Sequence, residues 1–261
     1  GNRGGSREKG VSNWPALIQE LRLWQQQGLV PTLWWRDDDC QQDTAALRRL
    51  SQLSLDYQIP LHLAVIPRGA DASLKSVFFD NPWLFALQHG YSHRNHAPKT
   101  ERKCELGEHR PLSEVVHELQ QGREYLNLLL GQQVFVPLLV PPWNRVTDTL
   151  LPHLSEIGLV GLSTLGPRLA ERCYQLPQVN VHIDIIDWKI RSFAGDQRVL
   201  SQLLTHLQGR REGLFDVTEA TGLMTHHLAH DEQCWEFCQR LFEVMADYGG
   251  QWQEPSQLFP E

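Results

Sequence analysis

The feature that most constrains the fold is a regular alternation of short apolar runs with longer amphipathic segments from residue 31 onward. Seven apolar runs have the length and composition of buried strands, and an extended piece near the C-terminus is a candidate eighth. These runs are PTLWWR, LHLAVIP, LFALQH, VFVPLLVP, LVGLST, VNVHIDII and TGLMTHH, followed by QWQEPSQL. Strands that alternate with helices run parallel, so the sequence predicts an α/β fold, namely a deformed (β/α) barrel with seven or eight parallel strands.

A doubly wound open sheet is the alternative architecture. That fold usually carries a glycine-rich phosphate loop after its first strand, whereas three aspartates follow the first strand here. Helices are expected where a capping residue precedes helical spacing or a glycine ends it. They are expected over residues 43–54 with Asp43 as cap, 113–131 between Ser113 and Gly131, 147–158, 196–208 with Asp196 as cap, and 231–249 with Asp231 as cap.

The composition narrows the class of protein and of partner. The chain has 261 residues, 41% of them hydrophobic, which suffices for one domain over residues 13–261 after a flexible lead or cloning remnant at 1–12. A net charge of -7 and the lack of a Lys- or Arg-rich run argue against nucleic-acid and membrane partners. Five cysteines without a C-x-x-C pair favour a reducing, cytoplasmic location, although a removed signal peptide stays open. The oligomeric state is left open.

Unusual polar groups follow five of the expected strands. They lie at residues 37–39, 89–96, 141–145, 187–188 and 226–227. In (β/α) barrels the carboxyl ends of the strands carry the active site, so these groups are expected to converge there. His89 and His93, four residues apart, can direct two imidazoles at one ion. Together with one aspartate they would leave the open coordination position of a catalytic zinc site.

The segments RDDD, HGYSH, PPWN, DW and MTHH, in this order, resemble the five motifs of the polysaccharide deacetylase family, over roughly residues 32–228. The resemblance implies the barrel fold and a zinc-dependent deacetylase, which is a hydrolase of carbon–nitrogen bonds other than peptide bonds. The implied substrate is an N-acetylated sugar or oligosaccharide, which would place the protein in carbohydrate metabolism. Another divalent transition metal, such as cobalt, nickel or manganese, could replace zinc.

The resemblance also assigns roles to the first two motifs. It implies Asp37 as the general base and Asp38 as a metal ligand, with Asp39 where the family has glycine. His89 and His93 would be the other two metal ligands. A metal held in this way would activate water and polarise the acetyl carbonyl.

The later motifs imply an acid and a substrate pocket. His226 would protonate the leaving amine, and Asp187 would orient the imidazole of His226. The implied substrate-binding residues are Trp143, Asn144, Trp188 and Met224. His227 is expected to point to the opposite face of its strand and to be structural.

The chain departs from the family pattern at the third motif. Val140 stands where the family has the arginine that tethers the base. Arg145, five residues later, or Arg36, beside the base, could take over that role, and the sequence does not decide between them. We count Arg145 among the candidate catalytic residues.

Two further expectations concern residues outside the motifs. His182 and Asp184 share a strand face and are expected to be a satisfied buried pair. The segment RKCELG, with Lys103 and Glu105, is expected to be a solvated charged loop.

Two other functions stay open on the sequence. The protein could hydrolyse a different amide, such as a cyclic imide or ureide, on the same barrel. It could also be a glycan-binding protein without catalytic activity, although a binding protein needs neither a base nor an acid.

Overall fold

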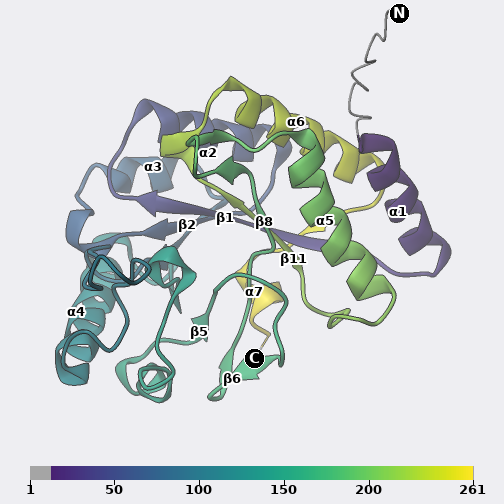
Figure 1. The fold of residues 1–261 in the computed structure, drawn as a ribbon. Coiled ribbons are helices and arrows are strands. Elements are labelled where there is room, and N and C mark those ends of the chain that lie inside the picture. The colour runs from purple at the N-terminus through teal and green to yellow at the C-terminus, as the bar shows by residue number, and fades with distance from the viewer. Residues whose placement is uncertain (1–12, 261) are drawn as a thin grey trace, which may run out of the picture.

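A curled sheet of parallel strands forms the centre of the computed structural model, which describes residues 13–260 (Figure 1). The expectation for residues 1–12 lies outside the described residues. The sheet order is β5-β4-β3-β2-β1-β11-β8, with β12 beside the start of β1, and all of these pairings are parallel. The strands are β1 (Thr32–Cys40), β2 (Leu61–Val65), β3 (Leu84–Gln88), β4 (Phe135–Leu139), β5 (Gly161–Leu162), β8 (Ile183–Asp184), β11 (Thr221–Thr225) and β12 (Gln251–Trp252). The predicted deformed (β/α) barrel is confirmed as a curled half-barrel.

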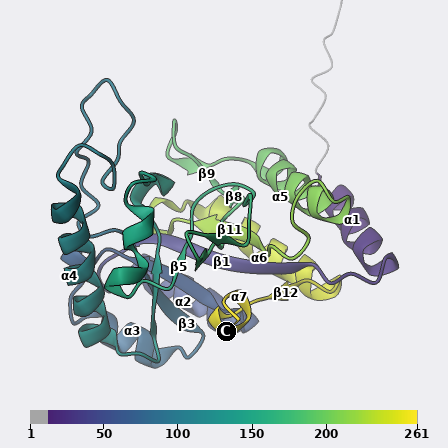
Figure 2. The same ribbon diagram turned by 90° about the horizontal axis from the view of Figure 1, so that it is seen from below.

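Helices pack on the convex side of this sheet. They are α1 (Trp14–Gln26), α2 (Ala45–Tyr57), α3 (Leu74–Asp80), α4 (Leu112–Leu130), α5 (Asp196–Arg211) and α6 (Glu232–Asp247). The short helix α7 (Pro255–Leu258) lies on the inner side instead, where Leu258 packs in the same core as Trp34. Helices α1 and α5 lie side by side in both views (Figure 1 and Figure 2), where Arg211 Nε donates to Glu20 Oε2 at 2.6 Å. Among residues 13–260, no helix combines the length and the apolar character that a membrane span requires.

The expected helix ends were partly correct. Asp231 caps α6 as predicted, because its side chain accepts a hydrogen bond from the Cys234 amide at 3.0 Å. Gly131 ends α4 with a left-handed φ of 84°. Thr44 rather than Asp43 caps α2, since the Thr44 hydroxyl accepts from the Leu47 amide at 3.1 Å. Asp43 pairs with a nearby arginine instead.

Three expected elements differ in the structure. Segment 147–158 forms two short 3-10 turns, Leu151–His153 and Ser155–Ile157, because Pro152 lacks the amide that a continuous helix needs there. The expected sixth strand breaks into β8 and β9 (Ile186–Asp187), and β9 pairs with β10 (Ser192–Phe193) in an antiparallel hairpin. The expected eighth strand is only β12, and helix α7 follows it. The sequence did not predict α1, α3 or the small hairpin β6 (Arg172–Cys173) and β7 (Leu176–Pro177).

The two faces of the sheet hold separate apolar cores. Trp35 of β1 belongs to the core between the sheet and the outer helices. Trp34 belongs to a second core inside the half-barrel, together with Met224 of β11. Side chains alternate between the two faces of a strand, so Arg36 follows Trp34 inward and Asp37 follows Trp35 outward. This alternation decides which acid of β1 can reach a site inside the half-barrel.

Candidate active site

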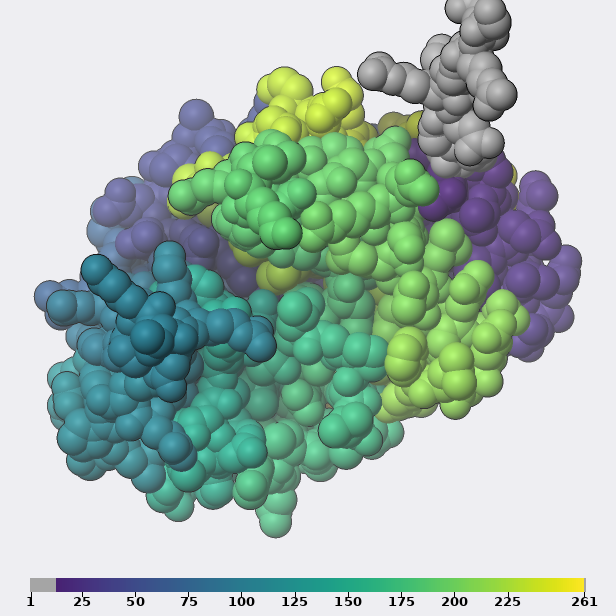
Figure 3. Space-filling view, viewed as in Figure 1, coloured from purple at the N-terminus to yellow at the C-terminus, as the bar shows by residue number. Residues whose placement is uncertain are grey.

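A cavity of about 550 Å³ opens at the carboxyl ends of the strands. Figure 3 shows this face of the molecule, hollowed between the green segment that leads to α5 and the teal segments below it. Nine of the eleven site residues predicted from the sequence line the cavity: Asp38, His89, His93, Trp143, Asn144, Arg145, Trp188, Met224 and His226. The structure therefore brings most of the predicted residues together, and it leaves out Asp37 and Asp187.

Asp39, His89 and His93 form a cluster that could hold a metal ion. Asp39 Oδ1 lies 3.0 Å from His89 Nε2 and 3.2 Å from His93 Nε2. Ligand atoms around a tetrahedral zinc ion stand ~3.3 Å apart, given metal–ligand distances of about 2.0–2.1 Å. The expected third ligand, Asp38, is not part of this cluster. Asp39 stands in that place, and a metal bound here would shift the ligand register of the first motif by one residue.

The hydrogen bond on the far side of His89 leaves the nitrogen that faces Asp39 free to bind a metal. His89 Nδ1 lies 2.8 Å from the Val140 carbonyl oxygen. A carbonyl oxygen only accepts, so Nδ1 carries the proton and neutral His89 presents a lone pair at Nε2. Burial lowers the pKa of His89, but the carboxylates of Asp38 and Asp39 outweigh burial and raise the pKa. The donors and the tautomer both fit a divalent metal.

A local break in β1 explains why two adjacent acids reach the same cavity. Asp39 has a left-handed φ of 71°, and the pairing of β1 with β2 shifts register between Asp37 and Cys40. Aspartate tolerates this conformation better than most residues. Because the bulge interrupts the alternation of side chains, Asp38 and Asp39 both line the cavity while Asp37 stays on the outer face.

Arg36 holds Asp38 through a bidentate ion pair. Its Nε donates to Asp38 Oδ1 and its Nη2 to Asp38 Oδ2, both at 2.9 Å. The Arg36 side chain is fully buried and also donates to Ser163 Oγ at 2.9 Å and to Asn144 Oδ1 at 2.7 Å. Arg145 instead donates to the Lys103 carbonyl oxygen at 2.7 Å. Of the two candidates for the missing arginine, Arg36 is the one that contacts an acid of the site.

Asp37 cannot reach the cavity, which corrects its predicted role as the base. It is fully buried, and its Oδ2 accepts from the Thr225 hydroxyl at 2.7 Å and from the His227 amide at 2.9 Å. Its Oδ1 contacts His227 Nδ1. Burial raises the pKa of Asp37, but the His227 imidazole outweighs burial and lowers the pKa. A base must come within hydrogen-bond reach of water, so Asp37 is a structural partner of His227, which points away from the site as expected.

His226 lies against the cavity with both ring nitrogens available. Neither nitrogen has a hydrogen-bond partner within residues 13–260, and Nε2 lies 3.6 Å from Asp184 Oδ1. Trp188 stands edge-on to the imidazole at 4.7 Å, and its Nε1 donates to Asp184 Oδ2 at 2.9 Å. Burial lowers the pKa of His226, but Asp184 and the other nearby aspartates outweigh burial and raise the pKa.

Asp184 therefore occupies the position that the sequence assigned to Asp187. Asp187 pairs with Arg198 at 3.1 Å and does not line the cavity. The break between β8 and β9 separates the two acids and leaves Asp184 beside His226. The expected pair of His182 with Asp184 does not form, because His182 bonds to Glu219.

The third motif shapes one wall of the cavity through unusual backbone. Trp143 and Asn144 both have left-handed φ angles, of 57° and 54°. The Trp143 ring lies 4.4 Å from the His93 ring, and Asn144 accepts from Arg36. Consecutive left-handed residues are strained, and such strain is concentrated at functional sites. Met224 lies beside Asn144, and its sulfur is 3.2 Å from Arg36 Nη2.

Glu105 is a positioning residue that the sequence analysis missed. It is buried and accepts hydrogen bonds from the amides of Tyr91, at 3.0 Å, and Ser92, at 2.9 Å, in the loop that carries His93. Gly90 has a φ of 60°, and a Cβ there would lie 2.1 Å from Glu105 Oε1. The only sequence signal for this contact was Gly90 inside the H-x-x-x-H segment, because a glycine there allows another group to pack against the backbone of the loop. The expected solvated loop is thus anchored at Glu105.

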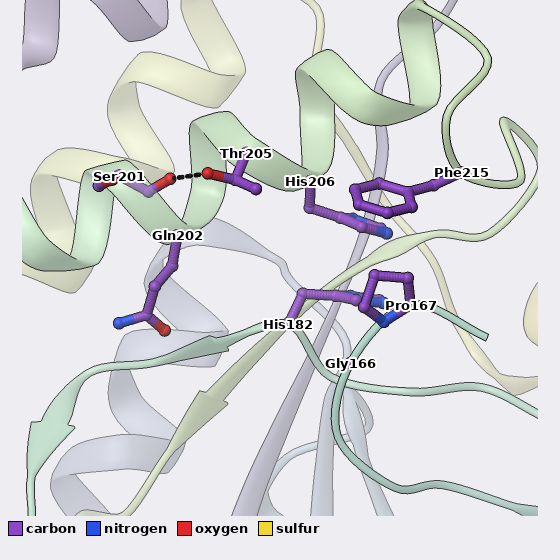
Figure 4. Close-up of a pocket in the computed structure, with 8 residues that line it drawn as sticks. All are labelled: Gly166, Pro167, His182, Ser201, Gln202, Thr205, His206 and Phe215. Atoms are coloured by element: carbon purple, nitrogen blue, oxygen red, sulfur yellow. Dashed lines mark hydrogen bonds between the residues drawn. The ribbon is translucent and has the colours of Figure 1, made fainter.

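A second cluster with the same donor types consists of His182, His206 and Glu219. Figure 4 shows its two histidines, of which His206 lies on α5. His182 Nε2 and His206 Nε2 lie 3.0 and 3.1 Å from Glu219 Oε1, and the two rings stack at 3.5 Å. The Gly222 amide donates to His182 Nδ1 at 2.9 Å. Nδ1 of the neutral ring must therefore be unprotonated, and Nε2 carries the proton and cannot bind a metal. This cluster is a hydrogen-bonded core element beside a pocket of about 310 Å³.

No protein-family model and no curated protein matches the sequence. Solved structures do match in fold. A family 4 carbohydrate esterase from Streptomyces lividans superposes with a TM-score of 0.56 at 13% identity, covering 87% of this chain and 94% of that one. The Bc1960 peptidoglycan N-acetylglucosamine deacetylase gives a TM-score of 0.57 at 12% identity, covering 90% and 95%. BA3943 from Bacillus anthracis, a family 4 pseudoenzyme, gives 0.55 at 11% identity, covering 88% and 66%.

These neighbours place the chain in a structural class. The protein has the fold of the family 4 carbohydrate esterases, which confirms the predicted resemblance to polysaccharide deacetylases at the level of the fold. Because one neighbour with this fold is described as a pseudoenzyme, the fold alone does not assign an activity. The activity has to be argued from the cavity.

Proposed function

We propose that this protein is a metal-dependent hydrolase of the polysaccharide deacetylase family that removes N-acetyl groups from a sugar or glycan. The observation that carries the proposal is the convergence of three groups in one cavity. These are a cluster with metal-ligand geometry at Asp39, a tethered carboxylate at Asp38 and an unbonded imidazole at His226. Amide hydrolysis needs a polarised carbonyl, a base and an acid, and the three groups supply one each.

Asp39, His89 and His93 would hold the metal, and zinc is the first expectation for two nitrogens and one carboxylate oxygen. When bound, the metal would polarise the acetyl carbonyl and make water more acidic. The Val140 carbonyl keeps His89 in the tautomer that binding requires. The Glu105 carboxylate fixes the loop that presents His93.

Asp38 would act as the base. Both of its oxygens accept from Arg36, and each keeps a second lone pair that can take a proton from the attacking water. Arg36 holds the carboxylate at one orientation, which limits the entropy that must be lost on the way to the transition state. In the register of the family motif, Asp38 and Asp39 then match the two aspartates, and Cys40 stands at the glycine position. The arginine that is absent at Val140 is supplied from the strand of the base itself.

His226 would protonate the leaving amine. Its pKa is raised by Asp184, which favours the protonated ring that an acid needs. Trp188 holds Asp184 by a hydrogen bond and flanks the imidazole. The faces of Trp143 and Trp188 would bind the sugar ring by stacking.

The proposal is tested by acetate release from N-acetylated mono- and oligosaccharides, with and without chelator and with zinc, cobalt, nickel or manganese restored. Acetate release that a chelator abolishes and a metal restores is the expected result. Turnover of a cyclic imide or ureide without acetate release from any sugar would favour the other amide hydrolase. Glycan binding without turnover under every metal would favour a non-catalytic protein; one neighbour of this fold is described as a pseudoenzyme.

A further inference from the structure

We propose that the substrate carries a negatively charged group, a carboxylate or a phosphate, which the cations at the mouth of the cavity recognise. Lys103, Arg145 and Arg191 line this mouth. The inference rests on the proposed deacetylase function and deepens it, because it names the chemical class of the acetylated substrate.

The acids of the cavity already have partners. Asp38 forms a bidentate pair with Arg36, and Asp39 lies between two imidazoles that would share a metal with it. Asp184 accepts from Trp188 and faces His226. None of these carboxylates is left to neutralise the cations at the mouth.

The three cations have no such partner. Within residues 13–260, no carboxylate oxygen lies within 4.0 Å of the charged nitrogens of Lys103, Arg145 or Arg191. Arg145 Nη1 donates to the Lys103 carbonyl oxygen at 2.7 Å, which holds the guanidinium in place and leaves its other donors free. Burial and the nearby Arg102 both lower the pKa of Arg145, which means that they disfavour its charged form. An anion bound beside the guanidinium would offset both effects.

The cations also come from separate parts of the chain. Lys103 lies in the loop that Glu105 anchors, Arg145 follows the third motif, and Arg191 lies in the turn between β9 and β10. Three independent segments thus place positive charge around one opening, in a chain whose net charge is -7. The acids that line the same cavity are held by other groups, so these cations are left to attract and orient a ligand of opposite charge.

The geometry gives the anion a defined place relative to the reacting group. The acetamide would enter towards Asp39 and His226 at the floor of the cavity, with the ring beside Trp143 and Trp188. A carboxylate or phosphate on the same ring or its neighbour would then lie at the mouth. Arginine binds both carboxylates and phosphates with paired hydrogen bonds, so the structure does not favour one of these two anions over the other.

The test compares matched acetylated substrates of different charge. N-Acetylglucosamine is the neutral probe, N-acetylmuramic acid carries a carboxylate, and N-acetylglucosamine 6-phosphate carries a phosphate. We expect kcat/KM to be at least about tenfold higher for one of the anionic probes, mainly through KM, and to fall as salt is raised. The triple variant Lys103→Gln, Arg145→Gln, Arg191→Gln should lose that preference, and Lys75→Gln on the exposed side of α3 should keep it.

Equal kcat/KM for neutral and anionic probes would overturn the anion proposal while the deacetylase function stands. An equal loss on all probes in the triple variant would overturn it as well. If the metal-loaded protein turns over none of the probes, the deacetylase proposal fails for these substrates. The anion proposal is then tested by calorimetric binding of N-acetylmuramic acid and N-acetylglucosamine 6-phosphate. If neither anion binds more tightly than N-acetylglucosamine, the anion proposal is refuted.

Discussion

Two clusters in this molecule have nearly the same donor atoms, but only one of them is arranged to bind a metal ion. Asp39, His89 and His93 line the open cavity, whereas Glu219 lies with its two histidines beside α5. In each cluster one carboxylate oxygen lies 3.0–3.2 Å from two imidazole nitrogens. The donor set and spacing do not distinguish them.

The backbone partner of one imidazole in each cluster does distinguish them. The Val140 carbonyl accepts from His89 and leaves Nε2 free, whereas the Gly222 amide donates to His182 and keeps the proton on Nε2. His206 has no backbone partner of this kind: its Nδ1 lies 2.8 Å from the Thr221 hydroxyl, which also accepts from Arg210, and its Nε2 lies 3.1 Å from Glu219 Oε1. The hydrogen-bond partner of the second ring nitrogen therefore decides whether a histidine can bind a metal, as much as the spacing of the donor atoms does.

The largest expected effect comes from changing one carboxylate in each cluster. Asp39→Asn should abolish tight metal binding and lower kcat/KM for acetate release at least about a hundredfold, because the metal loses a ligand. Glu219→Gln makes the same chemical change in the second cluster and should retain the metal. The measurement is metal content per folded chain after zinc loading, together with acetate release. Two metal ions per wild-type chain, or equal metal loss in both variants, would break the comparison.

The next effect separates Asp38, the proposed base, from the two aspartates beside it. Asp38→Asn should keep the metal and lower kcat by about 10²–10⁴-fold, the range for loss of a general base. Asp37→Asn should act on folding instead, because it removes the buried carboxylate that accepts hydrogen bonds from Thr225 and His227, at a cost on the order of 1–3 kcal/mol. Urea unfolding and zinc content of both variants decide the assignment. Loss of metal in Asp38→Asn comparable to that in Asp39→Asn would restore the register expected from the sequence.

The three aspartates of β1 show which features the sequence predicted and which it did not. The alternation of strands and helices was predictable because hydrophobic periodicity reports burial directly. The convergence of motifs at the strand ends followed from the fold. The role of each aspartate did not, since a one-residue slip turns every side chain of a strand to its other face. Nothing in the letters RDDD reveals that Asp39 adopts a φ of 71°.

Other misses have a similar cause. Asp184 and Asp187 are both plausible partners for His226, and only the break between β8 and β9 decides between them. Glu105 lies in a segment of charged residues, and its burial depends on amides of a distant loop. These residues owe their roles to backbone geometry, which a single sequence does not encode in any local pattern.

The second cluster should also make the protein sensitive to acid. Burial lowers the pKa of His206 to about 4, against about 6.5 in an unfolded chain. Between these values the unfolded chain binds a proton that the folded chain does not, so the free energy of unfolding falls as the pH drops through this window, by on the order of 2–3 kcal/mol. Glu219, whose pKa the two histidines lower to about 2 against the effect of burial, continues the loss below pH 4.5.

Urea unfolding of the wild type and of His206→Gln between pH 7 and pH 4 tests this expectation. The variant should be less stable at pH 7, and the difference should shrink as the pH falls, because glutamine does not titrate. A constant difference across the range would show that His206 titrates equally in the folded and unfolded chains. Metal content should stay unchanged in the variant, which distinguishes this cluster from the one in the cavity.

The smallest expected effect tests the tautomer argument itself. Thr221→Val removes the hydroxyl that links Arg210 to His206 and preserves the shape of the side chain. The loss should be about 1 kcal/mol in the free energy of unfolding, because Arg210 keeps its bond to the Thr32 carbonyl oxygen. His206 Nδ1 would then lose its hydroxyl partner, but His182 would still be held by the Gly222 amide. We therefore expect no second zinc ion in Thr221→Val, and a gain of one would show that the backbone amide does not control this cluster.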